Sequence, residues 1–228
     1  MPDYPDEEHV VKIIDVQNVT HNVKRFTLSR PDNYHFMPGQ ATDIVINQPD
    51  WLKERRPFTF TGLNEWDKLE FTIKIYQDHK GVTNQLGQLK VGDELIIHDV
   101  FGAINYKGEG TFIAGGAGVT PFIAIFRQLN KEDKLANNQL FFSNKTSGDI
   151  ILKNEFEKIL GNNFINILSE EKDSHYQNGI VNEDFLKSNI KNLDQYFYVC
   201  GPDSMIESIA GILEKMGVDK ERVIREEF

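Results

Sequence analysis

A glycine-rich turn within residues 111–121 constrains the fold of this chain more than any other stretch. An apolar run at 111–114, typical of a short buried strand, is followed by three glycines in four positions. Thr120 stands where an N-cap oxygen is expected and Pro121 suits the first position of a helix, so the pattern predicts strand, turn and helix in succession. A helix N-terminus preceded by glycines attracts phosphate groups. Taken alone, the turn is equally compatible with a phosphate site and with a connection that binds nothing.

The second half of the chain alternates apolar strand-like runs with helical stretches. Such alternation predicts a parallel sheet with helices on both faces and ligands beyond the carboxyl ends of the strands. The glycine turn follows the first of these strands, Cys200 ends the fourth, and Gly217 is expected to cap the last helix. We expect five strands, at 111–114, 140–142, 164–168, 196–199 and 222–224, and helices near 121–130, 153–160, 182–189 and 203–216.

The first half has a different rhythm, with short β-type runs separated by turn signals, which favours a sandwich or a small barrel. Residues 69–75 alternate apolar and polar side chains, the pattern of a half-buried strand. A short helix is expected near 83–89. A polar, flexible segment at 106–110 predicts the boundary between a domain of residues 1–107 and one of residues 108–228. The runs lie at 10–20, 23–29, 42–46, 58–61, 69–76 and 95–97.

Composition excludes several classes of protein. The net charge of −10 disfavours a nucleic-acid binder, which needs a basic face. No apolar run approaches the roughly 20 residues that span a bilayer. Residues 1–8 are acidic and lack the pattern of a signal peptide, so a cytoplasmic protein is expected. The single cysteine excludes an internal disulfide framework and a four-cysteine iron–sulfur cluster, and the six histidines show no metal-binding spacing, so no metal site is expected.

Five separately placed motifs resemble those of the ferredoxin–NADP reductase family of flavoproteins. The resemblance covers nearly the whole chain. It implies a two-domain fold: a six-stranded antiparallel β-barrel that binds flavin, followed by an α/β domain with a five-stranded parallel sheet that binds NAD(P). The motifs are Arg56-Pro57-Phe58-Thr59, Gly81-Val82-Thr83, the turn from Gly115 to Pro121, Cys200-Gly201-Pro202, and Glu226-Glu227-Phe228 at the end of the chain.

The resemblance implies an NAD(P)H-dependent flavoprotein reductase. Hydride would pass from nicotinamide C4 to flavin N5, and electrons would then pass singly to a small carrier such as ferredoxin or flavodoxin. FAD is the expected flavin, and FMN is the alternative because the loop 77–80 is short. Two other readings stay open: a free-flavin or ferric reductase, and a non-enzymatic flavin-binding subunit of a larger complex.

The resemblance also implies roles for single residues, each with a structural alternative. Thr59 would lie within reach of flavin N5, Cys200 would position the nicotinamide, and Glu226 would act as an active-site carboxylate. Alone, these would be an ordinary strand threonine, a buried cysteine and one acid of a charged tail. The expected cofactor contacts are Arg56, Pro57, Phe58, Thr59, Gly81, Val82, Thr83, Gly116, Gly118, Thr120, Pro121, Lys145, Cys200, Gly201, Pro202 and Phe228.

Three of these contacts depend on particular side chains. Phe58 stands where the family usually has tyrosine, so the ring can stack on flavin but a hydroxyl hydrogen bond is lost. Phe228 would cover the flavin face that nicotinamide must occupy. Lys145 follows the second parallel strand, where the adenosine ribose should lie. Its ammonium group favours the 2′-phosphate of NADPH over NADH, although a lone lysine is usually a solvated surface charge.

Overall fold

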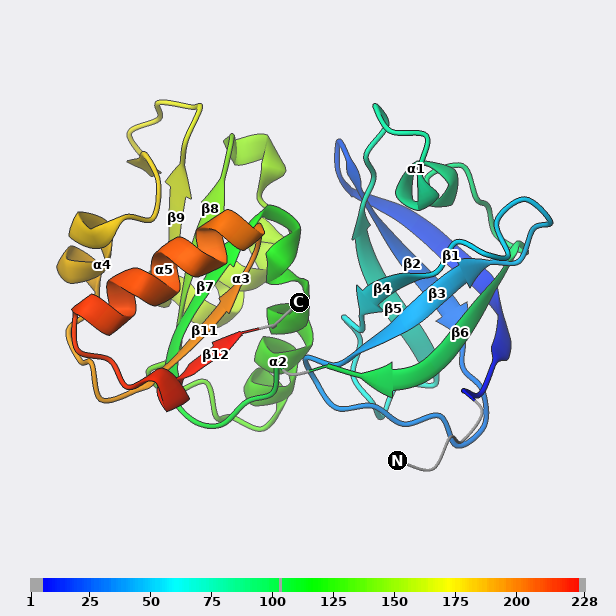
Figure 1. The fold of residues 1–228 in the computed structure, drawn as a ribbon, viewed down its shortest axis with the longest axis horizontal. Coiled ribbons are helices and arrows are strands. Elements are labelled where there is room, and N and C mark those ends of the chain that lie inside the picture. Colours follow the sequence, from blue (N-terminus) through cyan, green and yellow to red (C-terminus); the bar gives the residue numbers. More distant parts are fainter. Residues whose placement is uncertain (1–5, 103, 226–228) are drawn as a thin grey trace.

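The computed structural model describes residues 6–102 and 104–225, which form two bodies side by side (Figure 1). The first is a six-stranded antiparallel sheet in the order β4-β3-β6-β1-β2-β5. A bridge between Phe60 and Phe71 joins its two edge strands and closes the barrel. The strands are β1 (His9–Thr20), β2 (Val23–Ser29), β3 (Ala41–Ile46), β4 (Arg56–Thr59), β5 (Lys68–Lys74) and β6 (Glu94–Phe101), and the one α-helix in this described part is α1 (Val82–Leu86).

The second body is a parallel sheet in the order β10-β9-β8-β7-β11-β12. The expectation of five strands was wrong by one, because the two-residue β10 (Gln177–Asn178) extends the edge beside β9. The chain leaves β7 in one direction and returns on its other side at β11, which makes the ends of these two strands a switch point. The other strands are β7 (Gly110–Gly115), β8 (Gln139–Asn144), β9 (Phe164–Leu168), β11 (Tyr196–Cys200) and β12 (Val223–Arg225).

Helices cover both faces of the parallel sheet, as the alternation predicted. The helices α2 (Thr120–Lys131) and α3 (Lys153–Leu160) share one core with β7 and β8. The helices α4 (Glu183–Asn189) and α5 (Asp203–Lys215) pack on the opposite face. In Figure 1, α2 lies at the junction with the barrel. No helix in the described ranges is long and apolar enough to cross a membrane.

The buried Tyr198 of β11 fastens the connection between the two bodies. Its hydroxyl donates to the carbonyl of Gly108 at 2.8 Å and accepts from the N–H groups of Lys107 and Gly108 at 2.9 and 3.1 Å. Burial raises the pKa of Tyr198 to about 12, although the two backbone donors act against that rise. The polar segment expected at the domain boundary is therefore held against the parallel sheet.

Two local expectations were wrong. Val119, not Thr120, is the N-cap of α2, because a 3₁₀ turn over Gly116–Val119 precedes the helix and the Thr120 hydroxyl donates to the carbonyl of Ala117 at 3.0 Å. The strand β5 is not half-buried: Glu70 and Thr72, on its polar face, are 8% and 4% exposed. Arg127 of the second body donates to Glu70 and covers part of that face. Gly217, with φ +96°, follows α5 as expected.

Candidate functional site

Two adjoining cavities lie where the barrel meets the carboxyl ends of the parallel strands. The interdomain cavity, of about 610 Å³, is lined by β3, β4, β5, β6 and α1 of the barrel and by the glycine turn, α2 and Cys200 of the second body. The sheet-edge cavity, of about 510 Å³, lies over the ends of β7, β8 and β11. Lys74, Tyr76, Ala117 and Gly118 line both cavities, so the two adjoin along a shared wall and together make up the cleft between the bodies.

The barrel wall of the interdomain cavity contains part of each of the first two motifs. Phe58 and Thr59, near the end of β4, line it together with Thr83 from the first turn of α1. The antiparallel pairing of β4 with β3 places Phe58 opposite Thr42 and Thr59 opposite Ala41. A partly buried phenyl ring beside threonine hydroxyls suits a flat heteroaromatic ring with polar edges.

The glycines of the turn are required by close backbone packing. A Cβ at Gly118 would lie 2.3 Å from the carbonyl oxygen of Cys200, and one at Gly115 would lie 2.5 Å from the sulfur of Met205. Gly116 has φ +51°, which favours glycine. The turn is thus fitted tightly against the end of β11, and Gly118, Thr120, Pro121 and Cys200 all line the interdomain cavity.

The sheet-edge cavity has the position that a nucleotide occupies in an open parallel sheet. Gly116, Gly201 and Pro202 line it, in agreement with the sequence motifs. Asn144, at the end of β8, is 6% exposed and its Nδ2 group has no hydrogen-bond partner among the described residues. A buried amide donor in a cavity wall is costly to leave unpaired, which suits a polar ligand at this place.

Carboxylate side chains bind several polar groups of the loop after β8. Lys145 lies 2.9 Å from Glu170, and that contact raises the pKa of the ammonium group. The N–H and hydroxyl of Ser147 both donate to Glu171, at 2.7 and 2.9 Å. Asp149 accepts from the N–H and the hydroxyl of the preceding threonine, residue 146, and closes a capping box. Lys145, expected to favour NADPH, is therefore an exposed lysine that already pairs with a carboxylate.

Several predicted residues do not line the described cavities. Arg56 is exposed and pairs with Glu54 at 3.1 Å. Gly81 precedes α1 as its N-cap, and the side chain of Val82 is buried in the barrel core. Glu226 and Phe228 lie outside the described residues, so their roles stay predictions.

Sequence reasoning missed the two residues that join the cavities. Lys74 is the last residue of β5, and its ammonium group lies 5.8 Å from the ring centroid of Tyr76. Tyr76 is 46% exposed, directly after a run of apolar strand residues. The sequence carried no signal for this residue, because single exposed rings are common on protein surfaces and only the fold brings Tyr76 to the cavities.

The comparisons with known proteins agree with this arrangement. Residues 10–106 match the family model described as an oxidoreductase FAD-binding domain, and residues 112–211 match the one described as an oxidoreductase NAD-binding domain. The chain belongs to the ferredoxin–NADP reductase type of flavoprotein. It is an NAD(P)H-dependent reductase with FAD as its flavin. The described residues contain no group of three or more His, Cys, Asp or Glu side chains able to hold a metal.

Curated relatives of this flavoprotein reductase differ in the protein that they serve. The reductase component of propane 2-monooxygenase from Mycolicibacterium smegmatis is 25% identical, over 98% of this chain and 71% of the relative. Human NADH-cytochrome b5 reductase 1 is 27% identical, over 89% of this chain and 80% of the relative. The family therefore fixes the cofactors and leaves the electron acceptor open.

Solved structures show the same fold. A ferredoxin NADP⁺ reductase from Neisseria gonorrhoeae with bound FAD and NADP has a TM-score of 0.85 at 18% identity, covering 96% of this chain and 98% of that one. An Amycolatopsis cytochrome P450 reductase has the same TM-score at 19% identity, covering 98% and 70%.

Proposed function

We propose that this reductase takes hydride from NADH onto FAD in the interdomain cavity and passes electrons to a separate carrier protein of the ferredoxin or flavodoxin kind. The observation that carries the proposal is the wall that the two cavities share, made by Lys74, Tyr76, Ala117 and Gly118. When bound, the flavin accepts a hydride and releases its two electrons one at a time. The chain's own contribution is to hold two rings in contact and to exclude water.

The residues divide between the two cofactors by the cavity that they line. We assign Pro57, Phe58, Thr59 and Thr83 to the flavin, with Phe58 as its stacking surface. The N–H groups at Gly81 and Val82 and the charge of Arg56 remain candidates for its phosphates. A domain boundary at residue 107 stays part of this proposal, as does a cytoplasmic location.

The pyridine nucleotide would occupy the sheet-edge cavity. Its pyrophosphate would lie on the turn at Gly116 and Gly118, and Gly201 and Pro202 would border it. Cys200 lines the interdomain cavity together with Thr120 and Pro121, which supports the proposal that it holds the nicotinamide rather than attacking a substrate. Asn144 would give its unpaired amide N–H to the nucleotide.

NADH is the coenzyme that the charges favour. A 2′-phosphate near Lys145 would meet Glu170, Glu171 and Asp149, and would have to displace carboxylates that already hold the local donors. Ribose hydroxyls, in contrast, can donate to such carboxylates. Lys145 alone favoured NADPH. The carboxylates around it lead us to propose NADH instead.

The double variant E170Q/E171Q tests this choice. Removing two negative charges should raise kcat/KM for NADPH at least tenfold and change that for NADH less than threefold. Glu183→Gln, which removes an exposed α4 carboxylate paired with Lys187, is the matched control. A wild-type preference for NADPH, or an unchanged NADPH rate in the double variant, would refute the assignment.

The acceptor requires its own experiment, because the arginines near the flavin site are paired. Arg55 lies 2.5 Å from Asp6 and 2.6 Å from Asp43, and Arg56 pairs with Glu54. The net charge of −10 should then repel an acidic carrier, so its reduction should become faster as salt rises.

The FAD-loaded chain, reduced anaerobically with NADH, is mixed in parallel with ferredoxin, flavodoxin, cytochrome b5 and free FMN. Rapid, saturable reduction of ferredoxin or flavodoxin supports the proposal. Preferential reduction of cytochrome b5 would give the chain another carrier. Efficient turnover of free FMN alone would favour the free-flavin reductase alternative.

A further inference from the structure

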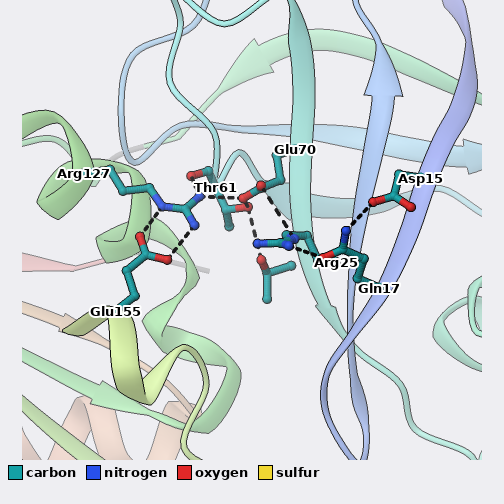
Figure 2. Close-up of polar contacts among 8 residues, drawn as sticks. Asp15, Gln17, Arg25, Thr61, Glu70, Arg127 and Glu155 are labelled. Atoms are coloured by element: carbon teal, nitrogen blue, oxygen red, sulfur yellow. Dashed lines mark hydrogen bonds and ion pairs between the residues drawn. The ribbon is translucent and has the colours of Figure 1, made fainter. Parts of the chain in front are cut away.

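The polar face of β5 is buried by a chain of four charges that crosses from the barrel to the second body. In order these are Arg25 on β2, Glu70 on β5, Arg127 on α2 and Glu155 on α3, with alternating signs (Figure 2). The side chains of Arg127 and Glu70 are only 11% and 10% exposed. Buried charges require compensation of this kind, and the four sum to zero.

Within this chain of charges, the guanidinium group of Arg127 connects the second body to the barrel. Arg127 donates to both carboxylate oxygens of Glu155, at 2.5 and 2.9 Å, on its own side. On the barrel side it donates to the carbonyl of Thr61 at 2.8 Å and to Glu70 at 2.5 Å. Trp66 of the barrel adds its ring, whose centroid lies 5.5 Å from the guanidinium carbon. The planar guanidinium group can hold one carboxylate with two donors and still donate to partners on its other side, whereas the three donors of lysine lie on one nitrogen and lack this fixed fork.

Both ends of this connection lead to the cofactor cleft. The helix α2 begins at Thr120, which lines the interdomain cavity, and Arg127 lies two turns farther along, about 10 Å at 1.5 Å per residue. On the barrel side, the Thr61 hydroxyl contacts Glu70 at 2.9 Å and the Thr72 hydroxyl at 3.2 Å. Thr72 also lines the interdomain cavity. Rotation of α2 about this connection would therefore move one cavity wall against the other.

We propose that Arg127 is a positioning residue, which fixes the second body against the barrel so that the nicotinamide lies in contact with the flavin. The inference rests on the proposed hydride transfer between the two cavities. Each cofactor would be held mainly by its own body, so loss of Arg127 should slow the step that needs both and spare the steps that need only the flavin. A purely stabilising salt bridge would show no such selectivity.

The test uses the full chain loaded with FAD and the variant Arg127→Gln. Anaerobic bleaching of the flavin by saturating NADH should slow by about 10- to 100-fold, because small misplacements of reacting atoms have effects of that size. Bleaching by dithionite and re-oxidation by ferricyanide, which need no nicotinamide, should stay within twofold. Lys131→Gln is the matched control, since it removes the exposed bridge from the same helix to Glu65.

Arg127→Lys is a second test variant, because it keeps the positive charge and loses the planar guanidinium group. The limiting rate at which NADH bleaches the flavin of this variant should fall at least fivefold, while the protein still binds its full complement of FAD. Arg127→Lys also replaces Arg127→Gln in the test if the latter does not fold. Wild-type NADH rates in these variants would overturn the proposal. Equal slowing of the dithionite and ferricyanide steps, or loss of FAD, would also overturn it. Wild-type protein that dithionite bleaches and NADH does not would instead show that the proposed function itself fails.

Discussion

Gly118→Ala tests how tightly the turn is fitted against the parallel sheet. The added Cβ would lie 2.3 Å from the carbonyl oxygen of Cys200 and 2.5 Å from its carbonyl carbon and from the nitrogen of Gly201. Ordinary contact begins at 3.4 Å, so the turn and the end of β11 must separate by about 1 Å. All three neighbours are backbone atoms, which cannot rotate away as a side chain can.

Two effects of this displacement can be measured. Overpacking of this kind costs about 1–3 kcal/mol, and each kcal/mol lowers the melting temperature by about 2–4 °C in a chain of this size. Because the turn and Cys200 both line the interdomain cavity, a shift of about 1 Å should also slow reduction of bound flavin by NADH about 100-fold. Thermal unfolding and stopped-flow absorbance give the two numbers.

Gly211→Ala is the matched control. Gly211 lies inside α5, and an added Cβ there would meet no atom within 4 Å, so alanine should stabilise the helix by about 0.5–1 kcal/mol and leave the rate unchanged. A Gly118→Ala protein with the melting temperature and the reduction rate of the wild type would refute this account of the turn.

Three further predictions concern single side chains. Phe58→Ala should weaken FAD binding about tenfold, because the stacking surface is lost; a fluorescence titration measures it, and unchanged affinity would count against the flavin assignment. Asn144→Leu should raise the melting temperature of the nucleotide-free protein, since an unpaired buried amide is removed, while raising the KM for NADH; a fall in both quantities would contradict the argument. Tyr198→Phe should cost about 1–3 kcal/mol by leaving the N–H groups of Lys107 and Gly108 without their acceptor. Since the folded pKa of Tyr198 is about 12, above the ordinary 10, its contribution is complete below pH 10 and lost as pH rises toward 12. Wild-type stability should thus approach that of Tyr198→Phe over this range, and parallel pH curves would refute it.

Local patterns predicted the order of elements well. The helix expected at 182–189 is α4 with Asn182 as its N-cap, and the one expected at 203–216 is α5. Both predictions depend on side-chain spacing and end signals within a dozen residues, which are visible along the chain. The two-residue β10 has no such signal, because its two hydrogen-bonded positions are set by the neighbouring β9.

Contacts between distant segments were beyond the sequence. Lys145 and Glu170 follow different strands, so their pairing, on which our proposal of NADH rests in part, appears only when β8 and β9 lie side by side. The alternation of β5 predicted a polar face open to water, and the sequence held no sign that Arg127 would bury Glu70. Tyr76 joins the two cavities for the same reason: the fold brings the glycine turn to it.

Anaerobic stopped-flow reduction of the FAD-loaded wild-type chain tests the central claim most directly. The sheet-edge cavity adjoins the interdomain cavity, and Glu170, Glu171 and Asp149 bind polar groups of the loop after β8, where we propose that the ribose lies. Flavin absorbance should therefore bleach at a rate that saturates with NADH, with kcat/KM at least tenfold above that for NADPH. Bound flavin that neither nucleotide bleaches would contradict the account of hydride transfer, and a preference for NADPH would contradict the account of the coenzyme.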